Sequence, residues 1–171
     1  MTKRTKKATP KQNRIYMVRT ALALILVALF FAVGGGIIYV KNQTATQTFT
    51  SNSMKVQFDY PTRYEVNEDT TDVLLTNNIG QISFGKSGTF YPNASEQVKY
   101  LSKTHLYTKT LMSQNINVRG LTGVKLLLDS QGDKKYEYIF VKDYTIYQFE
   151  ANDPALFSDL DAIAKSFRIL D

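Results

Sequence analysis

The architecture of this chain follows from one segment, Lys134-Lys-Tyr-Glu-Tyr-Ile-Phe-Val-Lys-Asp-Tyr-Thr-Ile-Tyr-Gln-Phe-Glu-Ala151. Its two halves, 134–142 and 144–151, are dense in Tyr, Ile, Phe and Val, which favour strands in the middle of a sheet. Only Asp143 separates the halves. Such a tight connection indicates antiparallel pairing, because parallel neighbours need a long crossover. The segment therefore predicts a central antiparallel hairpin.

Further strands are predicted on both sides of a helix in the middle of the domain. Met54, Val56, Phe58 and Tyr60 alternate with polar residues, as in a half-buried strand, and Pro61 ends the pattern. Shorter runs predict strands at 64–66, 73–76, 81–84, 116–119 and 122–129.

Two helices are predicted from their start signals. Asn93 followed by Glu96 has the spacing of a capping box and predicts a helix to about His105, with Val98 and Leu101 turned inward. Asp153-Pro154 predicts a second helix start. An apolar stripe at helical spacing follows and should lie on the sheet: Leu156, Phe157, Leu160, Ile163, Ala164 and Phe167. The expected fold is α+β, an antiparallel sheet flanked by helices.

A long apolar run, Thr20–Val40, precedes this domain and carries no charge. At ~1.5 Å per residue a helix of this length spans roughly 30 Å, the hydrocarbon thickness of a bilayer. Residues 1–19 contain seven Lys or Arg and no acidic residue, which predicts a cytoplasmic tail. We therefore expect a single-pass signal anchor, with the C-terminal domain outside the cytoplasm.

The anchor defines the expected domain organisation. Residues 1–19 form the tail, 20–40 the transmembrane helix, 41–48 a polar linker and 49–171 one extracytoplasmic domain. A cleaved secretory signal is the alternative, but the run is long and no Ala-x-Ala site follows it. The chain has no cysteine, which excludes thiolate chemistry and a lipoprotein anchor.

The net charge of +6 belongs to the anchor region and not to the domain. Residues 1–41 hold eight Lys or Arg and no Asp or Glu, which leaves 13 basic and 15 acidic residues in 42–171, a net charge of −2. The basic tail is explained by membrane topology, so we expect no nucleic-acid partner.

Two stretches at the ends of the domain resemble a known family. Phe49-Thr-Ser-Asn-Ser-Met-Lys-Val-Gln-Phe-Asp-Tyr-Pro61, with Tyr64-Glu-Val66, resembles the opening of PsbP/Mog1-like domains, and Ile163-Ala-Lys-Ser-Phe-Arg168 resembles their closing helix. The resemblance implies an α/β/α sandwich and a role as an adaptor or cofactor-retaining domain docked on a larger complex. It transfers no functional residue to this chain.

One stretch has the spacing of a phosphate-binding P-loop, Gly80-Gln-Ile-Ser-Phe-Gly-Lys-Ser87. A P-loop needs a strand before its first glycine and a helix at the lysine. Here Ile82 and Phe84 alternate like a strand, and Gly88–Pro92 does not favour a helix start. The stretch is better interpreted as a strand, with a nucleotide-binding enzyme that uses Lys86 as an alternative.

Other candidate chemical residues are isolated from one another. His105 is the only histidine and lacks partners for a triad or a zinc site. Asp129 and Asp133 flank a glycine turn that offers too few oxygens for calcium. Asp159 and Asp161 point in different directions on a helix and are interpreted as a solvated face. We therefore expect no catalytic residue, no metal and no cofactor.

Four tyrosines of the central hairpin, Tyr136, Tyr138, Tyr144 and Tyr147, form the candidate partner-binding surface. Tyrosine is enriched in binding surfaces but is also a good core residue of a sheet. Because Tyr136 and Tyr138 share a face with Phe140, and Tyr147 shares one with Phe149, core positions are the first expectation and the binding surface is the alternative.

The sequence as a whole predicts a non-enzymatic, membrane-anchored adaptor or binding domain. It would contact the bilayer through 20–40 and an extracytoplasmic protein through its domain. A nucleotide-binding enzyme and an assembly subunit of a surface structure are the alternatives.

Overall fold

The computed structural model describes residues 25, 45–104 and 108–170. Among them no helix is long and apolar enough to cross a membrane. The predicted tail, all of the predicted transmembrane helix except Ile25, and His105 lie outside the described residues. Residues from Thr44 onward form a compact unit of their own, and the fold described below is that of this unit.

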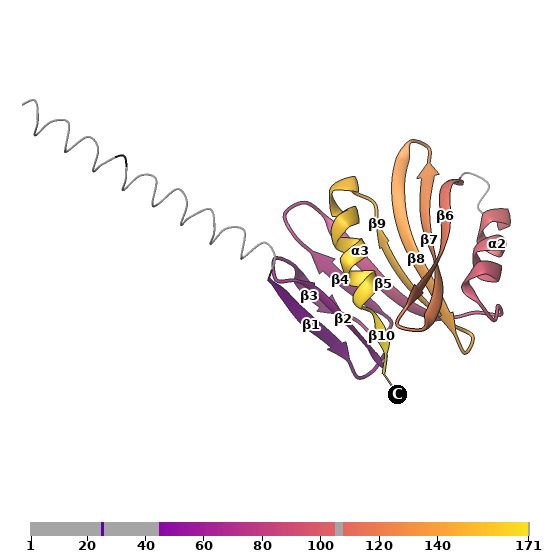
Figure 1. Cartoon of the computed structure of the whole chain (residues 1–171), viewed down its shortest axis with the longest axis horizontal. Coiled ribbons are helices and arrows are strands. Elements are labelled where there is room, and N and C mark those ends of the chain that lie inside the picture. The colour runs from indigo at the N-terminus through magenta and orange to yellow at the C-terminus, as the bar shows by residue number, and fades with distance from the viewer. Residues whose placement is uncertain (1–24, 26–44, 105–107, 171) are drawn as a thin grey trace, which may run out of the picture. The chain divides into compact units, whose positions relative to one another are not determined.

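The domain consists of two antiparallel sheets and two helices (Figure 1). The large sheet has the order β3-β4-β5-β9-β8-β7-β6, and the small sheet has the order β1-β2-β10. The elements are β1 (Thr46–Ser51), β2 (Val56–Pro61), β3 (Glu65–Glu68), β4 (Asp72–Thr76), β5 (Gln81–Gly88), α2 (Ala94–Thr104), β6 (Thr108–Val118), β7 (Leu121–Ser130), β8 (Asp133–Lys142), β9 (Thr145–Ala151), a 3₁₀ turn η1 (Pro154–Leu156), α3 (Phe157–Ser166) and β10 (Arg168–Ile169).

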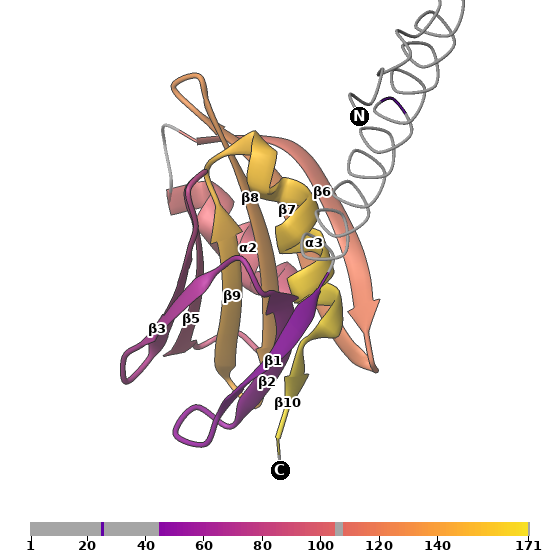
Figure 2. The ribbon, with the colours of Figure 1, turned by 90° about the vertical axis from the view of Figure 1, so that its left-hand side faces the viewer.

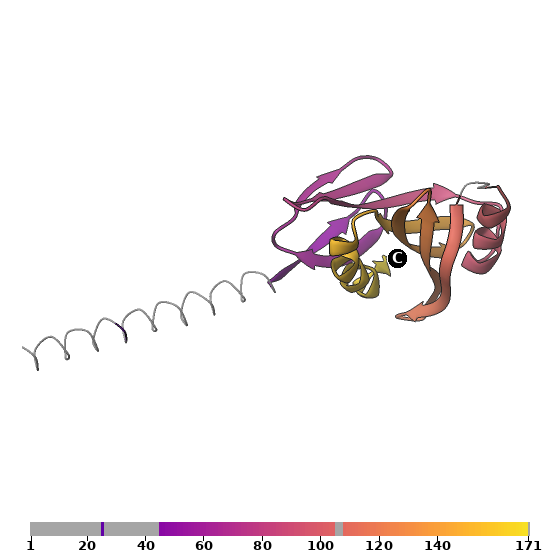
Figure 3. The same ribbon diagram turned by 90° about the horizontal axis from the view of Figure 1, so that it is seen from above.

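The two helices cover opposite faces of the large sheet. Figure 2 shows α3 and the small sheet in front of β8 and β9, with α2 behind them. The view from above shows the same separation of α2 from α3 (Figure 3). We call the α3 side the inner face and the α2 side the outer face.

The alternation of side chains along β8 builds a core on each face. Tyr138 and Phe140 join the inner core, while Ile139 and Val141 join the outer one. Because β8 lies between β7 and β9 and is covered on both sides, its residues 137–141 are all buried. The predicted central hairpin is confirmed, and so is the α+β architecture.

The inner core is aromatic and closely packed. Phe58, Phe84, Phe149 and Phe167 are at most 1% exposed, and their ring centroids lie 4.7–5.8 Å apart. The apolar stripe predicted on the last helix packs here, with only Phe157 half-buried. Gly123 permits one close approach, because a Cβ atom there would lie 2.5 Å from the Phe140 ring.

The predicted start of α2 at Asn93 is confirmed, whereas the predicted start at Asp153 caps the 3₁₀ turn η1, after which α3 begins at Phe157. The Glu96 amide donates to Asn93 Oδ1 at 2.9 Å, and the Ala155 amide donates to Asp153 Oδ1 at 2.8 Å. Each acceptor satisfies a backbone N–H that the first helical turn leaves without a partner.

Three strand predictions need correction. β1 begins at Thr46, so the last residues of the predicted 41–48 linker are paired with β2. β6 begins at Thr108 and not at Ile116, and β10 was missed. β1 and β6 are edge strands with mostly exposed side chains, so they lack the apolar alternation that identifies a strand.

Candidate functional site

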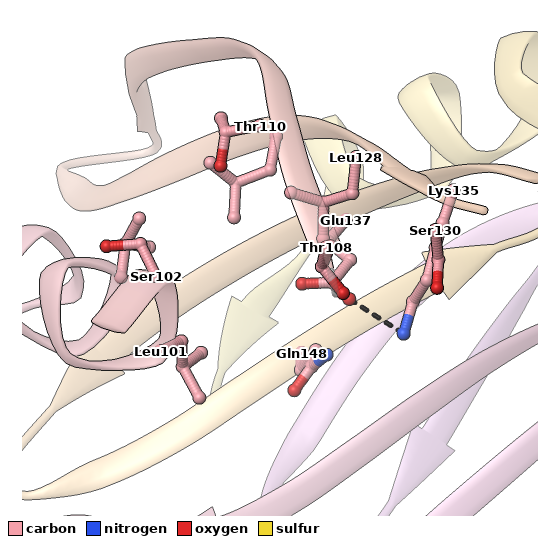
Figure 4. Close-up of a pocket in the computed structure, with 11 residues that line it drawn as sticks. Leu101, Ser102, Thr108, Thr110, Leu128, Ser130, Lys135, Glu137 and Gln148 are labelled. Atoms are coloured by element: carbon pink, nitrogen blue, oxygen red, sulfur yellow. Dashed lines mark ion pairs between the residues drawn. The ribbon is translucent and has the colours of Figure 1, made fainter. Parts of the chain in front are cut away.

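A pocket of about 310 Å³ opens on the outer face, between α2 and strands β6 to β9 (Figure 4). This volume is at the lower end of the ~300–1,000 Å³ range of small-molecule sites. The lining residues are Val98, Leu101 and Ser102 from α2, Thr108 and Thr110 from β6, Leu126, Leu128 and Ser130 from β7, Lys135 and Glu137 from β8, and Gln148 from β9.

The pocket exists because α2 covers the sheet unevenly. The first turn of the helix is buried through Ala94 and Gln97. Further along, Val98 and Leu101 pack against the outer core, and both stay half-buried. The C-terminal half of α2 therefore leaves a space above the sheet, with Leu126 and Leu128 beneath it.

The polar end of the pocket holds an ion-pair cluster. Lys135 Nζ lies 2.7 Å from Glu137 Oε1 and 2.7 Å from Glu150 Oε2. Glu137 and Glu150 sit directly opposite each other on β8 and β9, where like charges repel. Glu137 is only 5% exposed. One ammonium thus faces two carboxylates, and the cluster keeps one surplus negative charge.

Lys135 remains a cation in this cluster. Burial alone would lower its pKa, but the hydrogen bonds and the negative charges of Glu137 and Glu150 outweigh burial and raise it. A catalytic lysine needs the opposite shift, toward neutral pH. The pocket thus has a charged end, at Lys135 and Glu137, and an apolar side.

The structure does not bring the four predicted tyrosines to one surface, which corrects that prediction. Tyr138 and Tyr147 are buried, at 1% and 6% exposure. Tyr136 is half-buried against the ring of Phe157, with the centroids 4.0 Å apart. Only Tyr144, 60% exposed, is available to a partner. The other three lie on the inner face, where α3 and the small sheet cover the central strands.

Tyr144 lies in one of three connected segments that carry aromatic residues, which we together call the aromatic tip: Phe90, Tyr91, Tyr100 and Tyr144. Phe90 is 96% exposed and Tyr100 is 45% exposed. Tyr91 and Tyr100 pack with ring centroids 5.1 Å apart.

Thr89 connects the three segments of the aromatic tip. Its amide donates to the Tyr144 carbonyl at 2.8 Å, and its hydroxyl donates to Gln97 Oε1 of α2 at 2.6 Å. Sequence reasoning missed this group because Phe90 and Tyr91 lie in a Gly- and Pro-flanked loop without periodicity.

The backbone at Tyr144 is unusual for its residue type. Asp143 and Tyr144 have φ values of 50° and 57°, in the left-handed region. The β6–β7 and β7–β8 turns place Gly120 and Gly132 at the equivalent second position. Two-residue hairpin turns with positive φ favour glycine there, because a side chain is strained in this conformation.

The P-loop-like stretch forms strand β5 and not a phosphate loop. β5 pairs with β4 and β9, and the next helix starts only at Ala94. Lys86 Nζ donates to the Met54 carbonyl at 2.7 Å, so this lysine bonds within the domain. This geometry lacks the helix start that a P-loop requires.

The predicted aspartates have structural partners. Gly132 donates its amide to Asp129 Oδ1 at 2.8 Å, which closes the β7–β8 turn. Asp159 accepts from Arg63 and from the Tyr64 hydroxyl, each at 2.6 Å. Burial and the hydrogen bond to Asp159 raise the pKa of Tyr64 far above its usual value.

Asp161 accepts hydrogen bonds from Lys125 at 2.5 Å and from the buried Tyr138 hydroxyl. The interpretation of Asp159 and Asp161 as a solvated face was therefore wrong. Each carboxylate accepts hydrogen bonds from a basic side chain and from a tyrosine hydroxyl. The described residues contain no group of three or more His, Asp or Glu side chains arranged to hold a metal ion.

Comparison with known proteins shows the fold. The solution structure of cyanobacterial PsbP (CyanoP) from Synechocystis sp. PCC 6803 is similar to this chain, with a TM-score of 0.55 and 13% sequence identity. The similarity covers 73% of this chain and 92% of that protein. No protein-family model matches the chain, and neither does any curated protein. The chain thus has a PsbP-like fold, as its terminal stretches predicted.

Proposed function

We propose that this protein is a membrane-anchored, non-enzymatic adaptor domain that docks on the extracytoplasmic part of an envelope protein complex through its aromatic tip. The observation that carries the proposal is the 96% exposure of Phe90, in the loop whose Thr89 amide donates to the carbonyl of the exposed Tyr144. The PsbP-like fold is compatible with a binding domain outside the cytoplasm.

Exposed aromatic side chains are suited to binding. Burying a Phe side chain against a partner contributes about 1.5–3 kcal/mol, and Tyr adds area with few rotatable bonds. Aromatic residues are accordingly enriched at the centres of protein interfaces. The strained backbone of Tyr144 supports the same role, because strain at an exposed turn does not stabilise the fold.

The place of the aromatic tip favours a protein partner over the bilayer. β1, where the described domain begins, and α2 lie at opposite sides of the domain (Figures 1 and 3). The chain that follows the predicted anchor enters at β1, whereas Tyr91 and Tyr100 pack at α2. The aromatic tip is therefore remote from the end of the domain that the anchor would hold.

Site-specific photocrosslinking in intact cells tests the proposal. A photoreactive phenylalanine is placed at Phe90, at Tyr144, and at the exposed Asn78 in the β4–β5 turn as a control. We expect the same protein adduct from Phe90 and Tyr144, identified by mass spectrometry, and none from Asn78. Lipid adducts, or equal protein adducts from Asn78, would overturn docking through the tip.

Phe90→Ala should weaken partner binding without destabilising the domain. Because the side chain is almost fully exposed, the free energy of unfolding should change by less than about 0.5 kcal/mol. Recovery of the crosslinked partner should nevertheless fall at least tenfold. Unchanged recovery would contradict the role of Phe90.

The predicted topology is tested by cysteine labelling, since the chain has no cysteine of its own. Asn78→Cys should react in intact cells with a membrane-impermeant maleimide, while Thr5→Cys in the basic tail should react only after the membrane is permeabilised. The reverse pattern would place the domain in the cytoplasm.

A further inference from the structure

We propose that the outer-face pocket binds a small organic amine, with the ammonium group at Glu137 and an apolar body against Val98, Leu101 and Leu128. This ligand site is separate from the aromatic tip and does not depend on docking there.

The charge balance of the pocket selects a cation. Lys135 is shared between Glu137 and Glu150, so two carboxylates meet one ammonium. Lys135 Nζ lies 2.7 Å from Glu137 Oε1, and among the described residues no second cation is paired with this carboxylate. Because a carboxylate has two acceptor oxygens, Glu137 can accept a further charge-assisted hydrogen bond from a ligand. A ligand ammonium there would neutralise the cluster in a site where Glu137 is 5% exposed.

The same balance disfavours an anion. An anionic ligand at Lys135 would have to compete with two carboxylates that already lie 2.7 Å from Nζ. It would also bring a third negative charge to the cluster. Repulsion between like charges in a partly desolvated site makes this arrangement unfavourable.

The rest of the pocket fits the body of an amphipathic molecule. Val98 and Leu101 lie along α2, and Leu126 and Leu128 lie along β7. Figure 4 shows Leu101 on the helix side of the space and the Lys135–Glu137 pair on the opposite side. A volume of about 310 Å³ suits a small ligand such as an arylalkyl amine.

Three probes of similar shape separate charge from hydrophobicity: 2-phenylethylamine, 2-phenylethanol and 3-phenylpropionate. The full chain is reconstituted in lipid nanodiscs with labelled Leu and Val methyl groups, and empty nanodiscs correct for partitioning. Methyl NMR shifts of Leu101 and Leu128 report occupancy. We expect the amine to bind at least tenfold more tightly than the alcohol, and the carboxylate most weakly.

Three variants assign the contacts. Glu137→Gln should weaken amine binding about tenfold and leave binding of the alcohol unchanged. Lys135→Met removes the competing ammonium and should strengthen amine binding. Leu128→Phe fills the pocket and should abolish binding of all three probes. Glu65→Gln on the far edge strand β3 is the control and should change nothing.

Several results would overturn the proposal. Preferential binding of 3-phenylpropionate that Lys135→Met abolishes would make this an anion site. Equal binding of amine and alcohol would remove the role of Glu137, and absence of methyl shifts with every probe would remove the site. If Glu137→Gln fails to fold, the probe ranking together with Leu128→Phe still decides the outcome.

Discussion

The inner and outer faces of the large sheet are built from the same strands but differ in how completely they are filled. On the inner face, four phenylalanine rings pack against one another with almost no exposed surface. On the outer face, half-buried aliphatic side chains surround a pocket with an ion-pair cluster at one end. The inner face therefore supplies most of the stability, and the outer face has space for a ligand.

The largest expected effect comes from emptying the inner face. Phe84→Ala removes a ring that contacts Phe58, Phe149 and Phe167, and should lower the free energy of unfolding by about 3–5 kcal/mol. Leu101→Ala on the outer face should lower it by only about 1 kcal/mol, since that side chain is already half-buried beside a pocket.

Urea denaturation of the full chain measures this difference through tyrosine fluorescence, because the chain has 11 tyrosines and no tryptophan. Equal losses for Phe84→Ala and Leu101→Ala would show that the two faces do not differ in their contribution.

A smaller effect is expected from overfilling the inner face. Gly123→Ala would place a Cβ atom 2.5 Å from the Phe140 ring and 2.8 Å from the Ile139 carbonyl oxygen. We expect a loss of about 2–3 kcal/mol, because a fully buried ring cannot move without disturbing the core. Gly88→Ala is the matched control, since no atom lies within 4 Å of its added Cβ. A melting temperature of Gly123→Ala equal to that of Gly88→Ala would contradict the close packing.

Asp161 should make the attachment of α3 to the inner face dependent on pH. Burial raises its pKa, but the hydrogen bonds from Lys125, Tyr138 and Lys165 outweigh burial and lower it. Because the folded pKa is below the unfolded value of about 3.9, this stabilisation is present above about pH 4 and is lost as pH falls through the folded pKa.

Asp161→Asn should cost about 2 kcal/mol at pH 7, where it leaves Lys125 and Tyr138 without their anion. The difference from the parent chain should shrink below pH 4, as followed by urea midpoints across pH. A difference that stays constant down to pH 2 would rule out titration of Asp161 as the cause.

The smallest expected change has the opposite sign. Tyr144→Gly should stabilise the domain by about 1 kcal/mol, because glycine adopts the positive φ of this turn without strain. The same substitution should reduce crosslinking of a partner from a probe at Phe90. Gly132→Ala, in the β7–β8 turn, should instead destabilise the domain. Destabilisation by Tyr144→Gly would show that this side chain serves the fold.

Sequence patterns identified the elements whose side chains face a core. The period of two along β2 and the helical spacing from Leu156 to Phe167 were confirmed, because burial of one face imposes those periods. β1 and β6 were missed or shortened because they are held by pairing to one neighbour and expose most side chains. The pocket could not be predicted, since it depends on how far α2 stands from the sheet.

The four tyrosines of the central hairpin show what sequence patterns can and cannot predict for single residues. Their positions in a central hairpin were predicted correctly, and the first expectation of core positions is confirmed for Tyr138 and Tyr147. Strand periodicity alone could not predict which tyrosine would stay exposed at the turn. The structure buries Tyr138 and Tyr147 and leaves Tyr144 at a strained turn beside the loop of Phe90.

The sequence by itself determined the two helices, the central hairpin, the strands that face a core and the PsbP-like architecture, because these follow from local propensity and from the periodicity of burial. The tertiary structure alone decided which aromatic side chains reach solvent and where two carboxylates share one lysine. Both depend on contacts between residues far apart in the chain: Thr89 joins Tyr144 to α2, and the pairing of β8 with β9 sets Glu137 opposite Glu150.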